Sequence, residues 1–292
     1  MRRMRRLVPS VQRTPVPPRI TAISSSLTMA ALIGGWVVFQ VLVLGGYSQD
    51  RAQDTLYSAF REQLASATAP IAAPIEPGRP VALLEIPRLG LRQVVVEGTA
   101  SSDLMAGPGH RRDTALPGQQ GVSIVYGRAS TFGGPFAEIG TLSPGDQIRV
   151  QTGQGELVYR VDGVRRGGDP LPAAVATGGA RLTLVTGEGS GRAAGISPGE
   201  VVYVDASASE GAFPAAARSA AVPPSELAMA SETTALPLLA LCLGLLVALT
   251  AALAVLRRRW PLATVWMLGV PVALGLAWFS TDTAARLLPN LL

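Results

Sequence analysis

The chain has 292 residues, of which 48% are hydrophobic and 15% charged, and its mean hydropathy of +0.32 is too high for a purely soluble protein. A formal net charge of +5 with a pI near 10.1 would suggest a nucleic-acid partner, but residues 48–235 carry fifteen arginines against nineteen acidic residues. This mildly acidic segment argues against nucleic acid, and the apolar excess indicates that part of the chain lies in a membrane.

Three apolar runs, 27–46, 236–256 and 262–279, approach the roughly 20 residues that cross a bilayer core. A cleaved signal peptide is the alternative for the first run, but no small-x-small cleavage site follows it, which favours a retained anchor. Arginines crowd the stretch before the first run and fill 257–259, so both places are predicted to be cytoplasmic. We therefore predict a multi-pass protein of the cell membrane with its N-terminus inside and its central domain outside.

The outer segment begins with an amphipathic pattern. Leu56, Phe60 and Leu64 recur at helical spacing within 50–65, which predicts a helix that continues away from the membrane. Four prolines in 67–80 then predict an extended linker. The predicted segments, in order, are a basic N-terminus (1–26), a membrane helix (27–46), a helix and linker (47–80), a β domain (81–206), an Ala/Pro/Ser linker (207–235), a membrane helix (236–256), a cytoplasmic turn (257–261), a membrane helix (262–279) and an outer tail (280–292).

Short β-branched runs separated by Pro and Gly turns fill the β domain and predict a mainly β fold, a small barrel of seven to eight strands. The predicted strands are Val81–Ile86, Arg92–Glu97, Val122–Tyr126, Gln147–Gln151, Leu157–Gly163, Arg181–Thr186 and Glu200–Asp205. Together with three membrane helices, this barrel is the predicted fold class.

A series of small motifs in this domain resembles the sortase family, most closely the class E type. The motifs are Pro87-x-Leu89-Gly90-Leu91, Val94–Thr99 (VVVEGT), Gly107-Pro108-Gly109-His110, Thr114-x-Leu116-Pro117-Gly118, Phe132-Gly133-x-Pro135-Phe136, Leu142-x-Pro144-Gly145-Asp146, a strand with Tyr159, and Leu182–Thr186. The resemblance implies an eight-stranded barrel and a cysteine transpeptidase, whose thiolate attacks the Thr–Gly carbonyl of a sorting signal, with a histidine moving the proton and an arginine supporting the substrate.

The residues that the resemblance assigns to chemistry are missing here. The histidine position holds Arg128, the cysteine position holds Gly187, and the arginine position falls within one residue of Glu200. An arginine stays protonated and cannot serve as a general base, and a glycine has no nucleophile. Arg128 is expected either to form a salt bridge with Glu188 across the cleft or, like Glu188, to point into solvent. The candidate groove residues are Tyr126, Arg128, Thr186, Glu188, Ser190 and Arg192.

Other reactive residues are few. His110, the only histidine, matches a framework position of the family, and a structural role such as holding a turn is favoured over catalysis. The single cysteine, Cys242, lies in the second apolar run. No metal and no cofactor are therefore expected.

These observations predict a membrane-anchored, catalytically inactive sortase-like protein that binds or scaffolds cell-envelope or pilus proteins. Its predicted partners are an extended peptide, an active sortase or another membrane subunit, with Gly244 offering surface for helix packing. The alternative is an active transpeptidase or hydrolase with relocated residues, in which Thr186 or Ser190 is the nucleophile.

Overall fold

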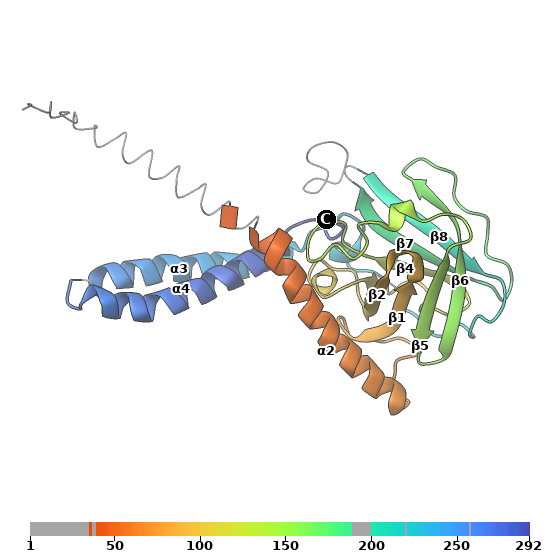
Figure 1. The fold of residues 1–292 in the computed structure, drawn as a ribbon, viewed down its shortest axis with the longest axis horizontal. Helices are drawn as coiled ribbons and strands as arrows, with labels where there is room; N and C mark the ends of the chain where they lie inside the picture. Colours follow the sequence, from red (N-terminus) through yellow and green to blue (C-terminus); the bar gives the residue numbers. More distant parts are fainter. Residues whose placement is uncertain (1–34, 37–38, 189–199, 220, 257) are drawn as a thin grey trace, which may run out of the picture. The chain divides into compact units, whose positions relative to one another are not determined.

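The computed structural model describes residues 35–36, 39–188, 200–219, 221–256 and 258–292, and eight of its strands close into a barrel (Figure 1). Around the barrel the strands follow the order β1-β2-β3-β4-β7-β8-β6-β5, and β5 pairs with β1 to complete the ring. The strands are β1 (Pro80–Ile86), β2 (Leu91–Glu97), β3 (Gly109–His110), β4 (Gly121–Tyr126), β5 (Gln147–Thr152), β6 (Gly155–Arg166), β7 (Ala180–Glu188) and β8 (Glu200–Ala208). The predicted mainly β barrel is confirmed.

Seven strands coincide with the predicted ones, and the eighth, β3, was not predicted. It has only two residues, too few to produce an alternating pattern, and it is a strand because it pairs in parallel with β2 and antiparallel with β4. Two pairs are parallel, β2–β3 and β4–β7, and the second joins chain segments 59 positions apart, such as Val122 and Arg181. The β4–β7 pair matters most here, because it joins the two strands that carry the predicted site.

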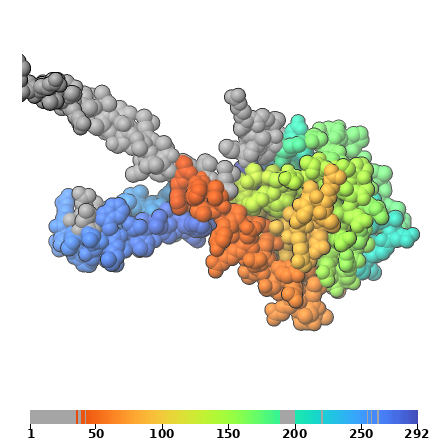
Figure 2. All heavy atoms as spheres, in the orientation of Figure 1, coloured from red at the N-terminus to blue at the C-terminus, as the bar shows by residue number. Residues whose placement is uncertain are grey.

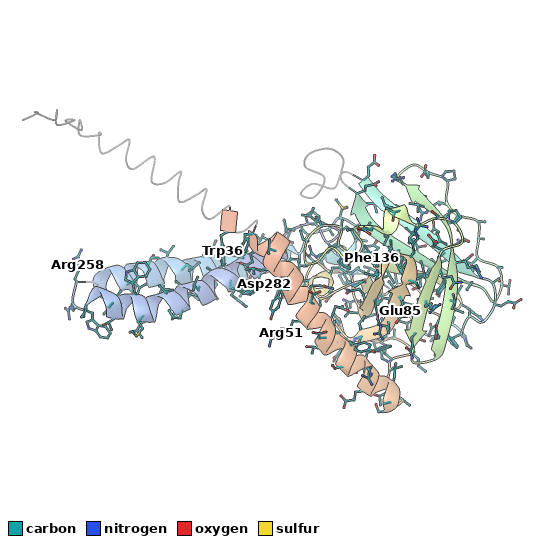
Figure 3. All side chains as sticks on the ribbon, viewed as in Figure 1. Trp36, Arg51, Glu85, Phe136, Arg258 and Asp282 are labelled. Atoms are coloured by element: carbon teal, nitrogen blue, oxygen red, sulfur yellow. The ribbon has the colours of Figure 1, made fainter. Side chains whose placement is uncertain are left out.

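Inward-facing apolar side chains fill the barrel. Because alternate residues of a strand point to opposite faces, Val125 on β4, Leu182 and Leu184 on β7 and Val204 on β8 all face the interior and are buried. Phe136, labelled in Figure 3, joins this core from the loop after β4 and is fully buried. The residues next to these in sequence must therefore face outward.

Helix α2 (Gly45–Ala65) covers the outer faces of β1 and β2 (Figure 2). The predicted stripe is the contact surface: Phe60 is 1% exposed and packs with Leu83 and Val94, and Leu56 and Leu64 lie beside it. The Gln53 side chain also bonds to the main chain of β2, since it accepts from the Val94 amide at 2.7 Å and donates to the Val94 oxygen at 3.1 Å. One outer face of the barrel is thus occupied by the chain itself.

The two predicted linkers are tied to the barrel and to each other. The Ala73 amide donates to the Ala217 oxygen at 2.9 Å, and the Gln119 side chain donates to the Ile71 oxygen at 2.8 Å. Phe213 exchanges main-chain hydrogen bonds with the Gly118 turn and covers it. These contacts hold both linkers along one end of the barrel.

Two helices of the described residues are long and apolar enough to cross a membrane, α3 (Leu236–Leu256) and α4 (Leu262–Ala285). The predicted span 27–46 lies mostly outside the described residues and remains a prediction. Arg258, labelled in Figure 3, stands in the turn between α3 and α4. Within this hairpin, Leu253 packs on Gly269, whereas Gly244 has no atom within 4 Å of where a Cβ would stand.

Helix α4 continues past the predicted end of its apolar run at Phe279. Ser280, Thr281 and Thr283 are polar, but each hydroxyl donates to the main-chain oxygen four residues earlier, at 2.7 to 2.8 Å. This back-bonding satisfies the hydroxyls within the helix. The predicted tail 280–292 therefore begins as helix up to Ala285, and 286–292 lie outside the helix.

Candidate functional site

A groove of about 480 Å3 lies on the outer face of β4, β7 and β8, which we call the outer groove. Its floor consists of outward-facing strand residues, and its walls come from the β6–β7 connection and from the chain before α3. The floor residues are Val122, Ile124, Tyr126, Arg181, Thr183, Val185, Tyr203 and Asp205, and the walls include Leu171, Pro172, Leu227 and Ala228. The floor is mainly apolar, with polar groups on one side.

The charges of the outer groove are arranged around Asp205. This carboxylate accepts from Arg165 at 2.6 Å and from the Thr183 hydroxyl at 2.7 Å, and the Arg165 guanidinium lies 4.1 Å from the centre of the Tyr203 ring. Arg181 is different, because its Nε is buried and has no hydrogen-bond partner among the described residues. The groove is therefore lined by two ion-paired arginines, Arg165 and Arg111, and by Arg181 with its unpaired Nε.

Tyr126, a predicted groove residue, does lie on the groove floor. Burial raises the pKa of its hydroxyl, and the neighbouring Arg111, which is ion-paired to Asp113 at 2.8 Å, opposes that shift. The hydroxyl stays protonated at neutral pH and can donate to a ligand.

The ends of β4 and β7, where the resemblance places the histidine and the cysteine, are joined by two hydrogen bonds. The Gly127 amide donates to the Val185 oxygen at 3.0 Å, and the Thr186 hydroxyl donates to the Gly127 oxygen at 2.9 Å. A Cβ at Gly127 would collide with the Phe136 ring, so only glycine fits there. Gly187 follows, buried, and pairs with Val201 on β8.

Arg128 is fully buried, and both expectations for it are wrong. Its Nη1 donates to the Thr131 hydroxyl at 2.9 Å, and its Nη2 donates to the Ser101 oxygen at 2.9 Å and hydroxyl at 2.7 Å. The Phe132 ring centre lies 5.1 Å away. Burial lowers the pKa of Arg128 to about 9, which leaves it charged at neutral pH.

Glu188, the expected partner of Arg128, pairs with another residue. Its carboxylate binds Arg166 on β6, at 2.6 Å from Nε and 3.0 Å from Nη2, and this half-exposed pair lowers the pKa of Glu188. The positions of the two residues explain why Glu188 pairs with Arg166 and not with Arg128. Glu188 is the last residue of β7, which neighbours β8 and then β6 in the barrel, whereas the Arg128 side chain is buried in the protein after β4. Glu200 lies directly opposite Glu188 in the β7–β8 pair.

The remaining predicted residues take no part in the outer groove as described. Thr186 is buried, with its hydroxyl bonded to the main chain, and Ser190 and Arg192 lie outside the described residues. His110 is buried on β3, where its ring bridges Glu97 at 2.8 Å and the Ala115 oxygen at 2.9 Å. Both ring nitrogens are thus engaged, and the ring holds the turn after β3, as expected of a framework residue.

Sequence reasoning missed Ser101, Thr131 and residues 288–292, which surround Arg128. Leu291 and Leu292 are buried there, 0% and 4% exposed. Among the described residues, no group of three or more His, Cys, Asp or Glu side chains could hold a metal ion. The expectation of no cofactor remains a prediction.

The barrel is closed, its β2–β3 and β4–β7 pairs are parallel, and the outer groove lies on β4, β7 and β8. Residues 84–194 match the family model described as "Sortase domain". The chain therefore carries a sortase domain.

Two curated relatives support this assignment. Sortase D of Bacillus subtilis is 29% identical over 138 residues, which cover 44% of this chain and 68% of the relative. Sortase SrtE1 of Streptomyces coelicolor is 34% identical over 93 residues, which cover 30% of this chain and only 26% of the relative.

Solved structures of the family are also similar. Sortase E from Streptomyces avermitilis is 29% identical with a TM-score of 0.36, and the match covers 45% of this chain and 89% of that one. A Sortase D5 transpeptidase from Clostridium perfringens is 21% identical with a TM-score of 0.42, covering 54% and 96%. The relatives thus include the predicted class E type.

Proposed function

We propose that this chain binds an extended segment of a cell-envelope or pilus protein in the outer groove and does not catalyse transpeptidation. The observation that carries the proposal is the pair of residues at the family's catalytic positions. Gly187 offers no thiol, and the Arg128 side chain is fully buried and points away from the groove. A nucleophile and a base must lie within hydrogen-bond reach of each other, and neither residue supplies one.

The outer groove has the properties of a peptide site. A volume of about 480 Å3 accommodates several side chains, and the floor offers Ile124 and Val185 to apolar groups. The Arg181 guanidinium and the Tyr126 hydroxyl line the groove and can donate to main-chain oxygens or to a carboxylate. Sortases act on envelope or pilus proteins, so a segment of such a protein is the proposed ligand.

Relocated catalysis is the weaker alternative. The Thr186 hydroxyl already donates its proton to the Gly127 oxygen, and a nucleophilic hydroxyl needs to donate to a base instead. His110 cannot act as that base, because both ring nitrogens are bonded to Glu97 and Ala115 behind the barrel wall. These contacts favour binding over chemistry.

The two apolar helices support a membrane location for the proposed binding module. In the proposed arrangement α3 and α4 form a hairpin that crosses the membrane twice, with Arg258 and Arg259 at its cytoplasmic turn. The predicted span 27–46 would add a third crossing. The proposed arrangement is a multi-pass anchor with the barrel outside.

The test uses the full chain purified in detergent with a library of labelled sorting-signal peptides and an amine acceptor. We expect saturable binding by fluorescence anisotropy, and neither cleavage nor an acyl-enzyme by mass spectrometry. Val122→Asp, which puts a charge on the groove floor, should weaken binding at least tenfold, an effect of about 1.4 kcal/mol.

The matched control is Val158→Asp. Val122 is 36% exposed and Val158 is 42% exposed, and both face outward on strands, but Val158 lies on β6, outside the groove. Equal effects of the two substitutions would refute binding in the outer groove. Peptide turnover that Ser190→Ala abolishes would refute the absence of chemistry.

A further inference from the structure

Residues 288–292, which we call the terminal segment, lie against the barrel just after β4 (the end marked C in Figure 1). The barrel holds the segment through main-chain groups. The Ala129 amide donates to the Leu291 oxygen at 3.1 Å, and the Thr131 amide donates to the Leu292 oxygen at 3.3 Å. The two acceptors are consecutive residues, and the Leu292 amide itself donates to the Pro289 oxygen at 3.1 Å, so the barrel binds the segment as a turn.

Asn290 fixes the position of the terminal segment along the barrel. Its side-chain Nδ2 donates to the Thr99 oxygen at 2.8 Å and to the Leu227 oxygen at 2.9 Å, and its main-chain amide donates to the Ala230 oxygen at 2.9 Å. The residue is fully buried. Only an amide offers two donors in this geometry without a charge, so the site selects asparagine at this position.

Leu291 supplies the apolar contact. It is 0% exposed and belongs to a buried cluster with Leu104, Tyr126 and Val185. Tyr126 and Val185 are also floor residues of the outer groove. The terminal segment therefore packs beside the outer groove, at Tyr126 and Val185.

Arg128 organises the polar part of this site. It donates to the hydroxyls of Ser101 and Thr131, and each hydroxyl then donates to the terminal segment, from Ser101 to the Leu288 oxygen at 3.2 Å and from Thr131 to the Leu292 oxygen. A guanidinium can only donate, so both hydroxyls must accept from it and turn their own protons toward the segment. The buried charge also polarises them and strengthens the second bonds.

From these contacts we infer that the terminal segment is a built-in peptide ligand of the barrel, and that Arg128 is the positioning residue of its binding site. The residue at the family's histidine position thereby has a role in binding residues 288–292. The segment directly follows α4, so its binding also ties that helix to the barrel. This inference does not depend on what the outer groove binds.

The test separates the ligand from its site. The chain lacking 288–292 is purified in detergent and titrated with a fluorescent synthetic peptide of residues 284–292. We expect saturable binding to the shortened chain and at least tenfold weaker binding to the intact chain, in which the site is filled. The same peptide with Asn290→Asp should bind the shortened chain at least tenfold more weakly.

The role of Arg128 is tested on the protein side. In the shortened chain, Arg128→Gln and Thr131→Val should each weaken peptide binding, and the double variant should lose less than the two effects combined, because the arginine acts through the hydroxyl. Thr131→Ser, which keeps the hydroxyl, should bind like the parent. Arg160→Gln, at an exposed position on β6, is the matched arginine control.

A second measurement covers the case in which the shortened chain does not fold. In the intact chain, Asn290→Asp should accelerate hydrogen exchange of the amides in 127–134 and leave β5 and β6 unchanged. The inference is overturned if this exchange is unaffected, if the folded shortened chain does not bind the peptide, or if it binds the peptide no better than the intact chain does. If residues 288–292 of one chain bind the site of a second chain instead, the intact protein would be a dimer and the shortened chain a monomer. That result would overturn the inference that the segment binds within its own chain.

Discussion

The Thr186 hydroxyl donates a hydrogen bond to the main-chain oxygen of Gly127, with 2.9 Å between the two oxygens. The bond links the end of β7 to the end of β4 at the point where the family carries out its chemistry. Both groups are buried, so the bond is structural, and water cannot replace it.

This bond predicts the effect of Thr186→Val, which keeps the shape and removes the donor. The Gly127 oxygen would be left unpaired, at a cost of about 1–3 kcal/mol. We expect a lower apparent Tm of the detergent-solubilised chain and no change in peptide cleavage measured by mass spectrometry. Cleavage in the parent that disappears in this variant would identify Thr186 as a nucleophile instead.

A second hydrogen bond predicts a cost in the barrel core. The Tyr159 hydroxyl, fully buried, accepts from the Gly118 amide at 2.8 Å, and burial raises the pKa of Tyr159 to about 12. Tyr159→Phe leaves that amide without a partner and should cost about 1–3 kcal/mol, measured as a lower apparent Tm.

The control for Tyr159 is Tyr57→Phe. The Tyr57 hydroxyl accepts from Arg92 at 2.8 Å on the exposed side of α2, where water replaces the lost partner. Its loss should change stability by less than about 0.5 kcal/mol. Equal losses in the two variants would mean that burial does not set the cost.

The barrel could be predicted from the sequence because its strands are regular. In β5 apolar residues alternate with polar ones, and Pro144-Gly145 and Pro117-Gly118 mark turns, so pattern and turn chemistry agree. Strand β3 could not be predicted, because pairing with β2 and β4 defines it and its own two residues do not.

The site around Arg128 could not be predicted for a different reason. Its partners Ser101 and Leu292 lie 27 and 164 positions away in the sequence, and neither belongs to a periodic element. A charged residue just after the end of a strand suggests a side chain that faces solvent or forms an ion pair, since a buried arginine normally has a carboxylate partner. Here two hydroxyls and a carbonyl replace that partner, and only tertiary structure brings them together.

Asp103 predicts a pH dependence of stability. Burial, with Glu226 and Glu232 nearby, raises its pKa from 3.8 to about 7, against the opposing effects of the Ala100 amide and Arg112. The folded chain therefore binds this proton more tightly than the unfolded chain does. The stabilisation is complete below about pH 4 and is lost as the pH rises to about 7, by at most about 1.4 kcal/mol per pH unit.

The measurement is the apparent Tm of the full chain between pH 5 and pH 8. Asp103→Asn should reduce the fall of the apparent Tm with rising pH. Part of this fall should remain, because burial also raises the pKa of Glu226. Asp162→Asn, on the exposed side of β6, should keep the slope of the parent. A slope that Asp103→Asn does not change would assign the pH dependence to other groups.

The last prediction concerns the α3–α4 hairpin. A Cβ at Gly269 would stand 2.7 Å from one δ-methyl of Leu253 and 2.9 Å from the other, whereas nothing lies within 4 Å of that point at Gly275 on the same helix. Gly269→Ala should be tolerated, because the leucine can rotate, but Gly269→Ile should force the helices apart and cost about 1–3 kcal/mol. Gly275→Ile is the matched control and should be neutral. Thermal unfolding in detergent, followed by Trp266 and Trp278 fluorescence, would detect the difference, and equal effects at 269 and 275 would mean that the two helices do not pack at Gly269.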